Sequence, residues 1–105
     1  MKHWSVYILR CRDGTLYTGI AIDLRRRLEA HRRGVAAKYT RSRRPVTLAY
    51  QESQPDHSRA LKREAALRRL GRAGKLALIA SLGSRRVRDL SARGLLLTPA
   101  PANPV

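Results

Sequence analysis

Apolar and polar positions alternate with a period of two in two short stretches near the start of the chain, residues 3–10 and 16–21. This period is typical of β-strands with one face packed on a core. The pair Asp13-Gly14 between the stretches is a strong hairpin signal. The pattern therefore predicts two antiparallel strands joined by a tight turn.

After the second stretch the apolar period becomes helical. Asp23 can cap a helix that runs from Leu24 to about Arg33 and ends at Gly34. Three residues fall at helical spacing on one side of this helix, namely Leu24, Leu28 and His31.

The rest of the chain alternates between basic loops and further elements. Residues 35–45 read as a basic loop, and residues 46–52 as a third strand. A second helix is expected from residue 57 to about 72, and a third, short helix over 73–82. Residues 83–105 are basic at first and then rich in proline, and we expect them to be partly disordered.

Length and charge restrict the class of protein. The chain has 105 residues, which is the size of one domain, and we place that domain at residues 1–82. Lys and Arg number 23 against 7 Asp and Glu, a net charge of +16. Self-repulsion of this size is tolerated most easily when the usual partner is a polyanion, and nucleic acid fits best.

Other features exclude a membrane protein and a disulfide-stabilised one. No apolar run approaches the ~20 residues of a membrane span, and no basic amphipathic helix carries aromatic anchors. The single cysteine, Cys11, cannot form an internal disulfide, so we expect a cytoplasmic protein. One cysteine and three scattered histidines give no zinc-ligand spacing.

The length of the hairpin loop decides whether two tyrosines share a face of the sheet. A two-residue loop would place Tyr7 and Tyr17 on opposite faces. A three-residue loop over residues 12–14 pairs Tyr7 with Gly19 and puts both phenols on one face, about 7–8 Å apart at the backbone. We expect the longer loop, with open space beside Gly19.

Two further residues have both a structural and a functional interpretation. Arg27 lies in a run of three arginines, but it is one turn from Leu24 and from His31, close to the apolar side of its helix. Glu64 lies at the edge of an apolar stripe, where it can form an ion pair with Arg68 or bind a hard cation.

Taken in order, these residues resemble the GIY-YIG nuclease domain. The two half-motifs read SVY, ending at Tyr7, and YTG, beginning at Tyr17; Arg27, a KYTR loop and Glu64 follow. The resemblance covers about residues 4–82 and is closest to the small stand-alone branch of the family. It implies an α/β fold in which a small three-stranded sheet, made of a β-hairpin and a third strand, is flanked by helices.

The resemblance also implies a chemistry, the hydrolysis of phosphodiester bonds with Mg²⁺ or Mn²⁺. Tyr17 would be the general base or would position the water, with help from Tyr7, while Arg27 would bind the scissile phosphate and Glu64 the metal. The expected contacts to nucleic acid, DNA in preference to RNA, come from His31, Lys38, Tyr39, Arg41, Arg43 and Arg44.

The chain departs from the family pattern at three points, and alternatives remain open. Ser5 replaces the first glycine of the motif, Thr18 replaces an isoleucine, and the only asparagine is Asn103 in the tail. We expect no second domain that would select the DNA target, so a protein partner is one way in which the target could be selected. A noncatalytic nucleic-acid-binding module on the same scaffold is the alternative, and a basic RNA-binding protein of ribosomal type is third.

Overall fold

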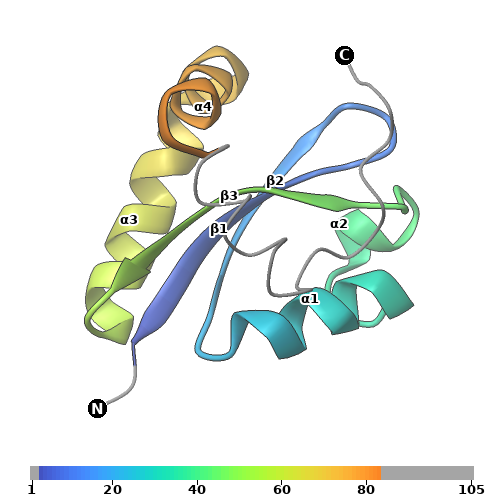
Figure 1. Cartoon of the computed structure of the whole chain (residues 1–105), viewed down its shortest axis with the longest axis horizontal. Coiled ribbons are helices and arrows are strands. Elements are labelled where there is room, and N and C mark those ends of the chain that lie inside the picture. Colours follow the sequence, from blue (N-terminus) through green and yellow to red (C-terminus); the bar gives the residue numbers. More distant parts are fainter. Residues whose placement is uncertain (1–2, 84–105) are drawn as a thin grey trace.

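A three-stranded antiparallel sheet lies at the centre of the computed structural model, which describes residues 3–83. Strand β1 (Trp4–Arg10) lies between β2 (Leu16–Ala21) and β3 (Thr47–Gln54). Figure 1 shows the sheet running between two groups of helices, one on each face. The α/β fold with a three-stranded sheet and flanking helices is therefore confirmed.

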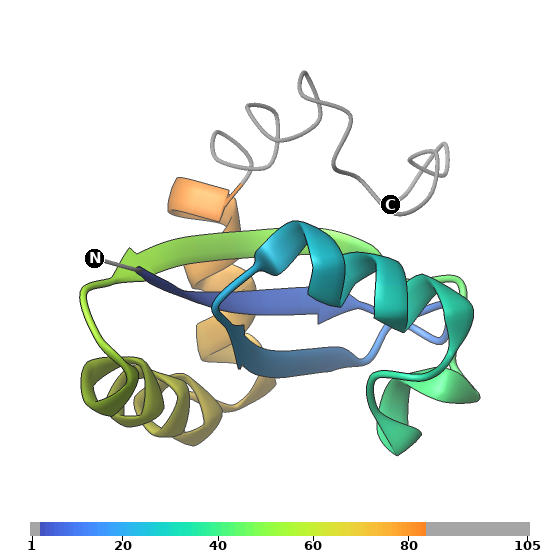
Figure 2. The same ribbon diagram turned by 90° about the horizontal axis from the view of Figure 1, so that it is seen from below.

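The two faces of the sheet are covered by different parts of the chain. Helix α1 (Leu24–Arg33) and the single turn α2 (Lys38–Arg41) cover one face, and α3 (His57–Arg69) and α4 (Gly71–Leu78) cover the other. A π-helical turn, η1 (Ile79–Gly83), continues α4. In Figure 2, α1 crosses in front of the strands and α4 lies behind them.

Each face has its own apolar cluster, because side chains of successive strand residues point in opposite directions. Toward α1, the buried residues of the cluster include Tyr7, Leu9 and Leu28. Toward α3, they include Val6, Ile8 and Leu67. The tyrosines Tyr7 and Tyr17 both belong to the α1 face.

The hairpin has the three-residue loop, which is the one we expect of the two that the sequence permits. The Cys11 amide donates to Thr15 at 2.9 Å, and the Gly14 amide donates to the Cys11 carbonyl at 2.9 Å. Gly14 has φ +85°, a left-handed conformation that glycine adopts without a steric penalty. The resulting register pairs Tyr7 with Gly19.

The first helix has the expected bounds and ends. The Asp23 carboxylate accepts from the Arg26 amide at 3.1 Å, and Gly34, at φ +80°, ends the helix. Leu24, Leu28 and His31 are its buried residues, as their spacing predicts.

Four predicted boundaries differ from the structure. Residues 35–45 contain the short helix α2, and β3 covers residues 47–54 instead of 46–52. The second helix ends at Arg69 because Gly71 takes φ +70°, which starts α4 as a separate helix. The tail predicted over residues 83–105 lies, apart from Gly83, outside the described residues, so the domain boundary stays a prediction. Within residues 3–83, no helix has the length and apolar character needed to cross a bilayer.

Candidate active site

Tyr7 and Tyr17 lie against the same glycine on the α1 face of the sheet. A Cβ atom on Gly19 would lie 2.6 Å from the Tyr7 hydroxyl and 3.2 Å from Cε2 of Tyr17. The space beside Gly19 is therefore filled by the Tyr7 phenol, which corrects our expectation of an opening there. Tyr7 is 1% exposed, whereas Tyr17 is only partly buried.

His31, on α1, joins Tyr7 to helix α2. Its Nε2 lies 2.8 Å from the Tyr7 hydroxyl and its Nδ1 lies 2.9 Å from Oγ1 of Thr40. Both tyrosine rings also meet the His31 ring edge to face, at centroid distances of 5.7 Å for Tyr7 and 5.4 Å for Tyr17. His31 is fully buried and its ring supports the tyrosines, so its expected direct contact with nucleic acid stays a prediction.

The hydrogen bonds assign the protons along this chain. The Thr40 hydroxyl donates to the Ala37 carbonyl at 3.3 Å, so its oxygen can accept from Nδ1–H of His31. Nε2 is then bare and accepts the proton of the Tyr7 hydroxyl. Tyr7 therefore donates to His31, and His31 donates to Thr40.

Burial keeps both members of the Tyr7–His31 pair uncharged. Burial, and secondly the Arg27 charge, lower the pKa of His31 to about 4. Burial is also the main cause that raises the pKa of Tyr7 far above its ordinary value; Tyr17 and Glu64 raise it further and Arg27 opposes them. At neutral pH, Tyr7 is therefore a phenol and not a phenolate, and it can donate or accept a hydrogen bond without becoming a base.

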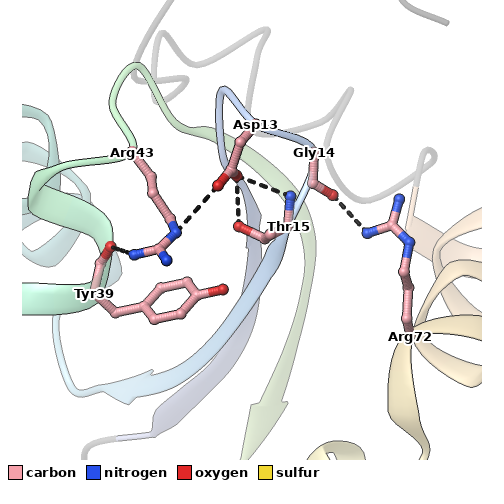
Figure 3. A network of polar contacts seen from close by, with 6 residues as sticks. All are labelled: Asp13, Gly14, Thr15, Tyr39, Arg43 and Arg72. Carbon is pink, nitrogen blue, oxygen red and sulfur yellow. Dashed lines mark hydrogen bonds and ion pairs between the residues drawn. The ribbon is translucent and has the colours of Figure 1, made fainter.

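The other side of the Tyr17 ring packs against Tyr39 and, beyond it, Arg43, which contacts the hairpin turn. The Tyr39 ring stacks on Tyr17 at a centroid distance of 5.9 Å, and the Arg43 guanidinium lies 4.0 Å above the Tyr39 ring. Arg43 also donates to the Asp13 carboxylate at 3.2 Å and to the Tyr39 carbonyl at 2.9 Å (Figure 3). Asp13 in turn accepts from Thr15, two residues before Tyr17.

The hairpin turn is held from its second side as well. Figure 3 shows Arg72, from α4, reaching the carbonyl oxygen of Gly14, to which its Nη1 donates. The turn therefore bridges α2 and α4, and this fixes the start of the strand that carries Tyr17.

Arg27 and Glu64 lie on the two helical layers, and the charge of each affects the pKa of Tyr7. Arg27 is exposed on α1, but its charge affects the pKa of both Tyr7 and His31. The Glu64 side chain on α3 is 18% exposed, and its Oε2 accepts from Arg68 at 3.1 Å. Arg68 also donates to the Thr18 carbonyl at 3.3 Å, which brings this ion pair next to the strand residue that follows Tyr17.

A hard cation fits the donor chemistry at Glu64. Mg²⁺ and Mn²⁺ take oxygen ligands, and Mg²⁺ commonly uses one or two carboxylates and keeps several waters. No group of three or more His, Cys, Asp or Glu side chains that could enclose a metal occurs within residues 3–83. The ion would therefore be shared between Glu64, water and substrate phosphate, and Arg68 would have to release part of the carboxylate.

The basic segment between α1 and β3 is divided between structural and free cations. Arg44 donates to the Arg41 carbonyl at 2.9 Å and to the Arg32 carbonyl at 3.3 Å, so it holds the ends of two helices. Arg43 is held by the Asp13 and Tyr39 contacts. Lys38 and Arg41 are exposed, which makes them better candidates for phosphate binding than Arg43 and Arg44.

Sequence reasoning missed two residues of this network and one buried carboxylate outside it. Thr40 is fully buried and orients His31, although the KYTR segment reads as an ordinary basic loop. The sequence indicates Arg68 as a partner of Glu64 on the same helix, but Arg68 also reaches β2. The third is Glu52 on β3, a buried carboxylate that Tyr50, Gln54 and Arg63 surround. A polar residue at a core position of a strand was the available signal for Glu52.

The comparisons with known proteins agree with this geometry. The GIY-YIG catalytic domain matches residues 3–77, and the chain belongs to this family. Within it, the chain is a member of the small UPF0213 group. A UPF0213 protein of Staphylococcus aureus is 54% identical over 79 residues, which cover 75% of this chain and 96% of that protein. One from Xanthomonas axonopodis pv. citri is 48% identical over 77 residues, 73% of this chain and 76% of that protein.

A solved structure supports the fold as well. The solution NMR structure of a UPF0213 protein from Bacillus halodurans matches with a TM-score of 0.52 and 38% identity, over 77% of this chain and 86% of that one. The chain therefore has the nuclease-like scaffold of the GIY-YIG family.

Proposed function

We propose that this protein is a divalent-metal-dependent endonuclease that hydrolyses phosphodiester bonds of nucleic acid, DNA in preference to RNA. The observation that carries the proposal is the packing of Tyr7 and Tyr17 around His31 on one face of the sheet, with the charges of Arg27 and Glu64 both affecting the pKa of Tyr7. The net charge of +16 supports a polyanionic substrate.

In this proposal, the phenolate form of Tyr17 orients the attacking water and takes one of its protons, while the water oxygen bonds to phosphorus. The bond to the leaving sugar oxygen breaks, and that oxygen takes up a proton from solvent. Arg27 holds the non-bridging oxygens of the phosphate, where negative charge increases in the transition state. Glu64 would hold Mg²⁺ or Mn²⁺, and the ion would supply polarisation of the phosphate and stabilisation of the charge on the leaving oxygen.

The remaining residues of the site keep Tyr17 in place. Tyr7 stays protonated and donates to His31, so it cannot compete with Tyr17 for the proton of the water. Tyr39 and His31 contact the Tyr17 ring and restrict its motion. Because these contacts already restrict Tyr17, it reaches its reactive geometry with little further loss of conformational entropy.

The second candidate is a noncatalytic nucleic-acid-binding module. The Glu64–Arg68 ion pair favours it, because a carboxylate that is paired within its own helix has a purely structural explanation. Under this alternative the basic surface binds nucleic acid, and neither Tyr17 nor Glu64 affects the bound strand.

Cleavage assays with two variants and one control separate these candidates. Wild-type protein is incubated with supercoiled, branched and single-stranded DNA, and with RNA, with Mg²⁺, with Mn²⁺ and with neither. We expect metal-dependent cleavage that falls about 10²–10³-fold in Tyr17→Phe and Arg27→Ala, because each loses a group aimed at the reacting phosphate. Arg25→Ala removes an exposed arginine from the same helix and should cut at close to the wild-type rate.

Binding is measured on the same proteins by fluorescence anisotropy of a labelled strand without metal. The proposal requires that Tyr17→Phe still binds. A wild-type protein that binds every substrate and cuts none with either metal would support the binding module instead.

A further inference from the structure

A small hollow lies between the hairpin and helix α4, on the sheet face opposite to the two tyrosines. Its volume is about 220 Å³. Two elements supply its lining, which consists of Thr15, Leu16, Gly71, Arg72 and Lys75. Among the described residues, this lining therefore holds two cations and no carboxylate.

The two cations of the hollow have no counter-charge. Within residues 3–83, neither Arg72 nor Lys75 forms an ion pair. Arg72 donates from Nη1 to the Gly14 carbonyl at 2.6 Å, and Figure 3 shows it beside the turn, on the side opposite to Arg43. A guanidinium has five N–H donors, so most of those of Arg72 are left for a ligand.

The ammonium group of Lys75 is in an unfavourable environment. Lys75 is partly buried, and burial, followed by the charge of Arg68, lowers its pKa. Among the described residues, no carboxylate opposes these two causes. An anion that binds beside Lys75 would stabilise its charged form, whereas an exposed lysine already has water around it.

The carboxylates of the adjoining segments are bound to other groups. Asp13, in the hairpin turn, accepts hydrogen bonds from Thr15 and Arg43. Glu64, on α3, accepts from Arg68. Residues 84–105 contain four arginines and one aspartate, so their composition is a poor source of negative charge. The missing anion is therefore better supplied by another molecule.

The size and charge of the hollow suit one phosphate group. Sites for whole small molecules have volumes of about 300–1,000 Å³, so this hollow is smaller than a nucleotide site. The guanidinium of Arg72 can donate to two phosphate oxygens at once, and the ammonium of Lys75 adds a point charge. The net charge of +16 favours a phosphate of nucleic acid over an isolated carboxylate.

The hollow and Tyr17 lie on opposite faces of one edge strand. Leu16 packs against the apolar cluster toward α3, whereas the next residue, Tyr17, packs against the cluster toward α1. Their strand, β2, lies at an edge of the sheet. One molecule of nucleic acid can therefore pass around this edge and contact both faces.

We propose that the hollow binds a second backbone phosphate of the nucleic acid through Arg72 and Lys75, in addition to the phosphate that Arg27 holds. This inference rests on the proposed function, because that function identifies the nucleic acid as the substrate. Arg72 also holds the Gly14 carbonyl, so the bound phosphate is fixed relative to the turn from which the strand of Tyr17 begins. The contact therefore orients the substrate relative to the hairpin.

Lys75→Met tests the hollow, because it removes the charge and keeps a long apolar side chain. Binding of full-length protein to a short labelled DNA duplex is measured by anisotropy, with EDTA, at about 50 to 200 mM salt. We expect the affinity at the low end of this range to fall about tenfold. The slope of log affinity against log salt should be smaller by about 0.9, the value for one phosphate contact.

The matched control is Lys62→Met, the same change at an exposed lysine of α3 that forms no ion pair within residues 3–83. It should bind with the affinity and salt slope of the wild type. In urea denaturation, Lys75→Met should be at least as stable as the wild type, since a partly buried charge has been removed. An unchanged salt slope in Lys75→Met would overturn the inference.

A second measurement identifies the source of the phosphate. The amide signals of Thr15 and Gly71 are followed by NMR while the duplex, inorganic phosphate or sodium chloride is added at low ionic strength. The duplex should shift both signals in the wild type and in Lys62→Met, but not in Lys75→Met. Shifts caused by inorganic phosphate and not by the duplex would overturn the proposal, because the hollow would then bind a free anion.

These outcomes are independent of the nuclease proposal. A smaller salt slope in Lys75→Met, together with the loss of both shifts, supports the phosphate site even if no substrate is ever cut. Metal-dependent cleavage by a wild-type protein whose two signals do not respond to the duplex would support the nuclease and remove the phosphate from the hollow.

Discussion

Two glutamates pair with arginines of the same helix, α3, and their surroundings differ completely. Glu52, on β3, is 7% exposed and accepts hydrogen bonds from Tyr50 at 2.6 Å and from Gln54 and Arg63 at 2.8 Å each. Glu64 accepts a hydrogen bond from one side chain among the described residues, Arg68, at 3.1 Å.

The difference is visible in the pKa of the buried carboxyl. Burial alone would raise the pKa of Glu52, but the hydrogen bonds from Tyr50, Arg63 and Gln54 outweigh it and lower the pKa. Both carboxylate oxygens of Glu52 are already used, so this group has little capacity for a metal ion. The comparison teaches that, if one of the two binds a metal ion, Glu64 is the better candidate, because only its carboxylate keeps an oxygen without a hydrogen bond among the described residues.

The largest expected effect that separates the two glutamates is on catalysis. In Glu64→Gln, the metal-dependent cleavage rate should fall about a hundredfold or more, because the anionic metal ligand is lost while size and shape are kept. The free energy of unfolding should change by less than about 1 kcal/mol, since Arg68 is 58% exposed and is solvated without its partner.

Rates are measured in single-turnover cleavage assays and stability by urea denaturation. Glu29→Gln is the matched control: Glu29 is exposed on α1, pairs with Arg32 and Arg33, and should affect neither quantity. Wild-type cleavage by Glu64→Gln would remove the metal from this site and leave the ion pair as the whole role of Glu64.

Glu52→Gln should show the reverse pattern. We expect a loss of about 2 kcal/mol in the free energy of unfolding, because Arg63 loses its buried counter-charge but is 38% exposed and partly solvated. Among folded molecules, the cleavage rate should be unchanged.

The pH dependence of unfolding gives a second measurement for Glu52. Because folding lowers the pKa of Glu52, its stabilising contribution is present above the unfolded pKa, about 4.3, and is lost as the pH falls through the folded value. Between about pH 5 and 3, the variant should therefore lose less stability than the wild type. Parallel curves would mean that the carboxylate gains nothing from its partners.

The smallest expected effect is on the free energy of unfolding and comes from the buried, uncharged hydroxyl of Thr18. Oγ1 of Thr18 is buried and has no hydrogen-bond partner in the part of the chain that the structure describes. Thr18→Val keeps the shape and removes this unsatisfied hydroxyl, so urea denaturation should give a free energy of unfolding higher by about 1 kcal/mol. Thr40→Val is the contrasting control, since it removes the hydroxyl bound to His31 and should lower stability. A loss of equal size in both variants would show that Thr18 has a partner after all.

Local signals predicted the parts of the fold that depend on neighbours in sequence. Asp23 and Gly34 gave both ends of α1, because each determines the backbone of the next few residues. Asp13-Gly14 gave the hairpin but permitted either loop length, and the three-residue loop is expected only because it puts Tyr7 and Tyr17 on one face.

The contacts that complete the candidate site join distant segments, and the sequence carries no local sign of them. Arg43 reads as one more cation in a basic loop, yet its position is set by Asp13 across the sheet edge and by the Tyr39 ring. His31 can be predicted to face the core, but the hydroxyl of Thr40 that fixes its tautomer cannot. Such partners follow from tertiary packing, which local patterns do not encode.

The fit of Tyr7 over Gly19 limits how the family motif can drift. Even alanine at position 19 would place a carbon atom 2.6 Å from the Tyr7 hydroxyl and 2.7 Å from its Cζ, so Tyr7 would have to move off His31 to make room. Phenylalanine at position 7 would remove the hydroxyl but not the clash with the ring. A lineage that replaced this glycine would therefore need a second substitution at the tyrosine, and each single step would pass through a disrupted centre. The two half-motifs are separate in the sequence, but in the structure Tyr7 and Gly19 pack so closely that a change of size at one requires a change at the other.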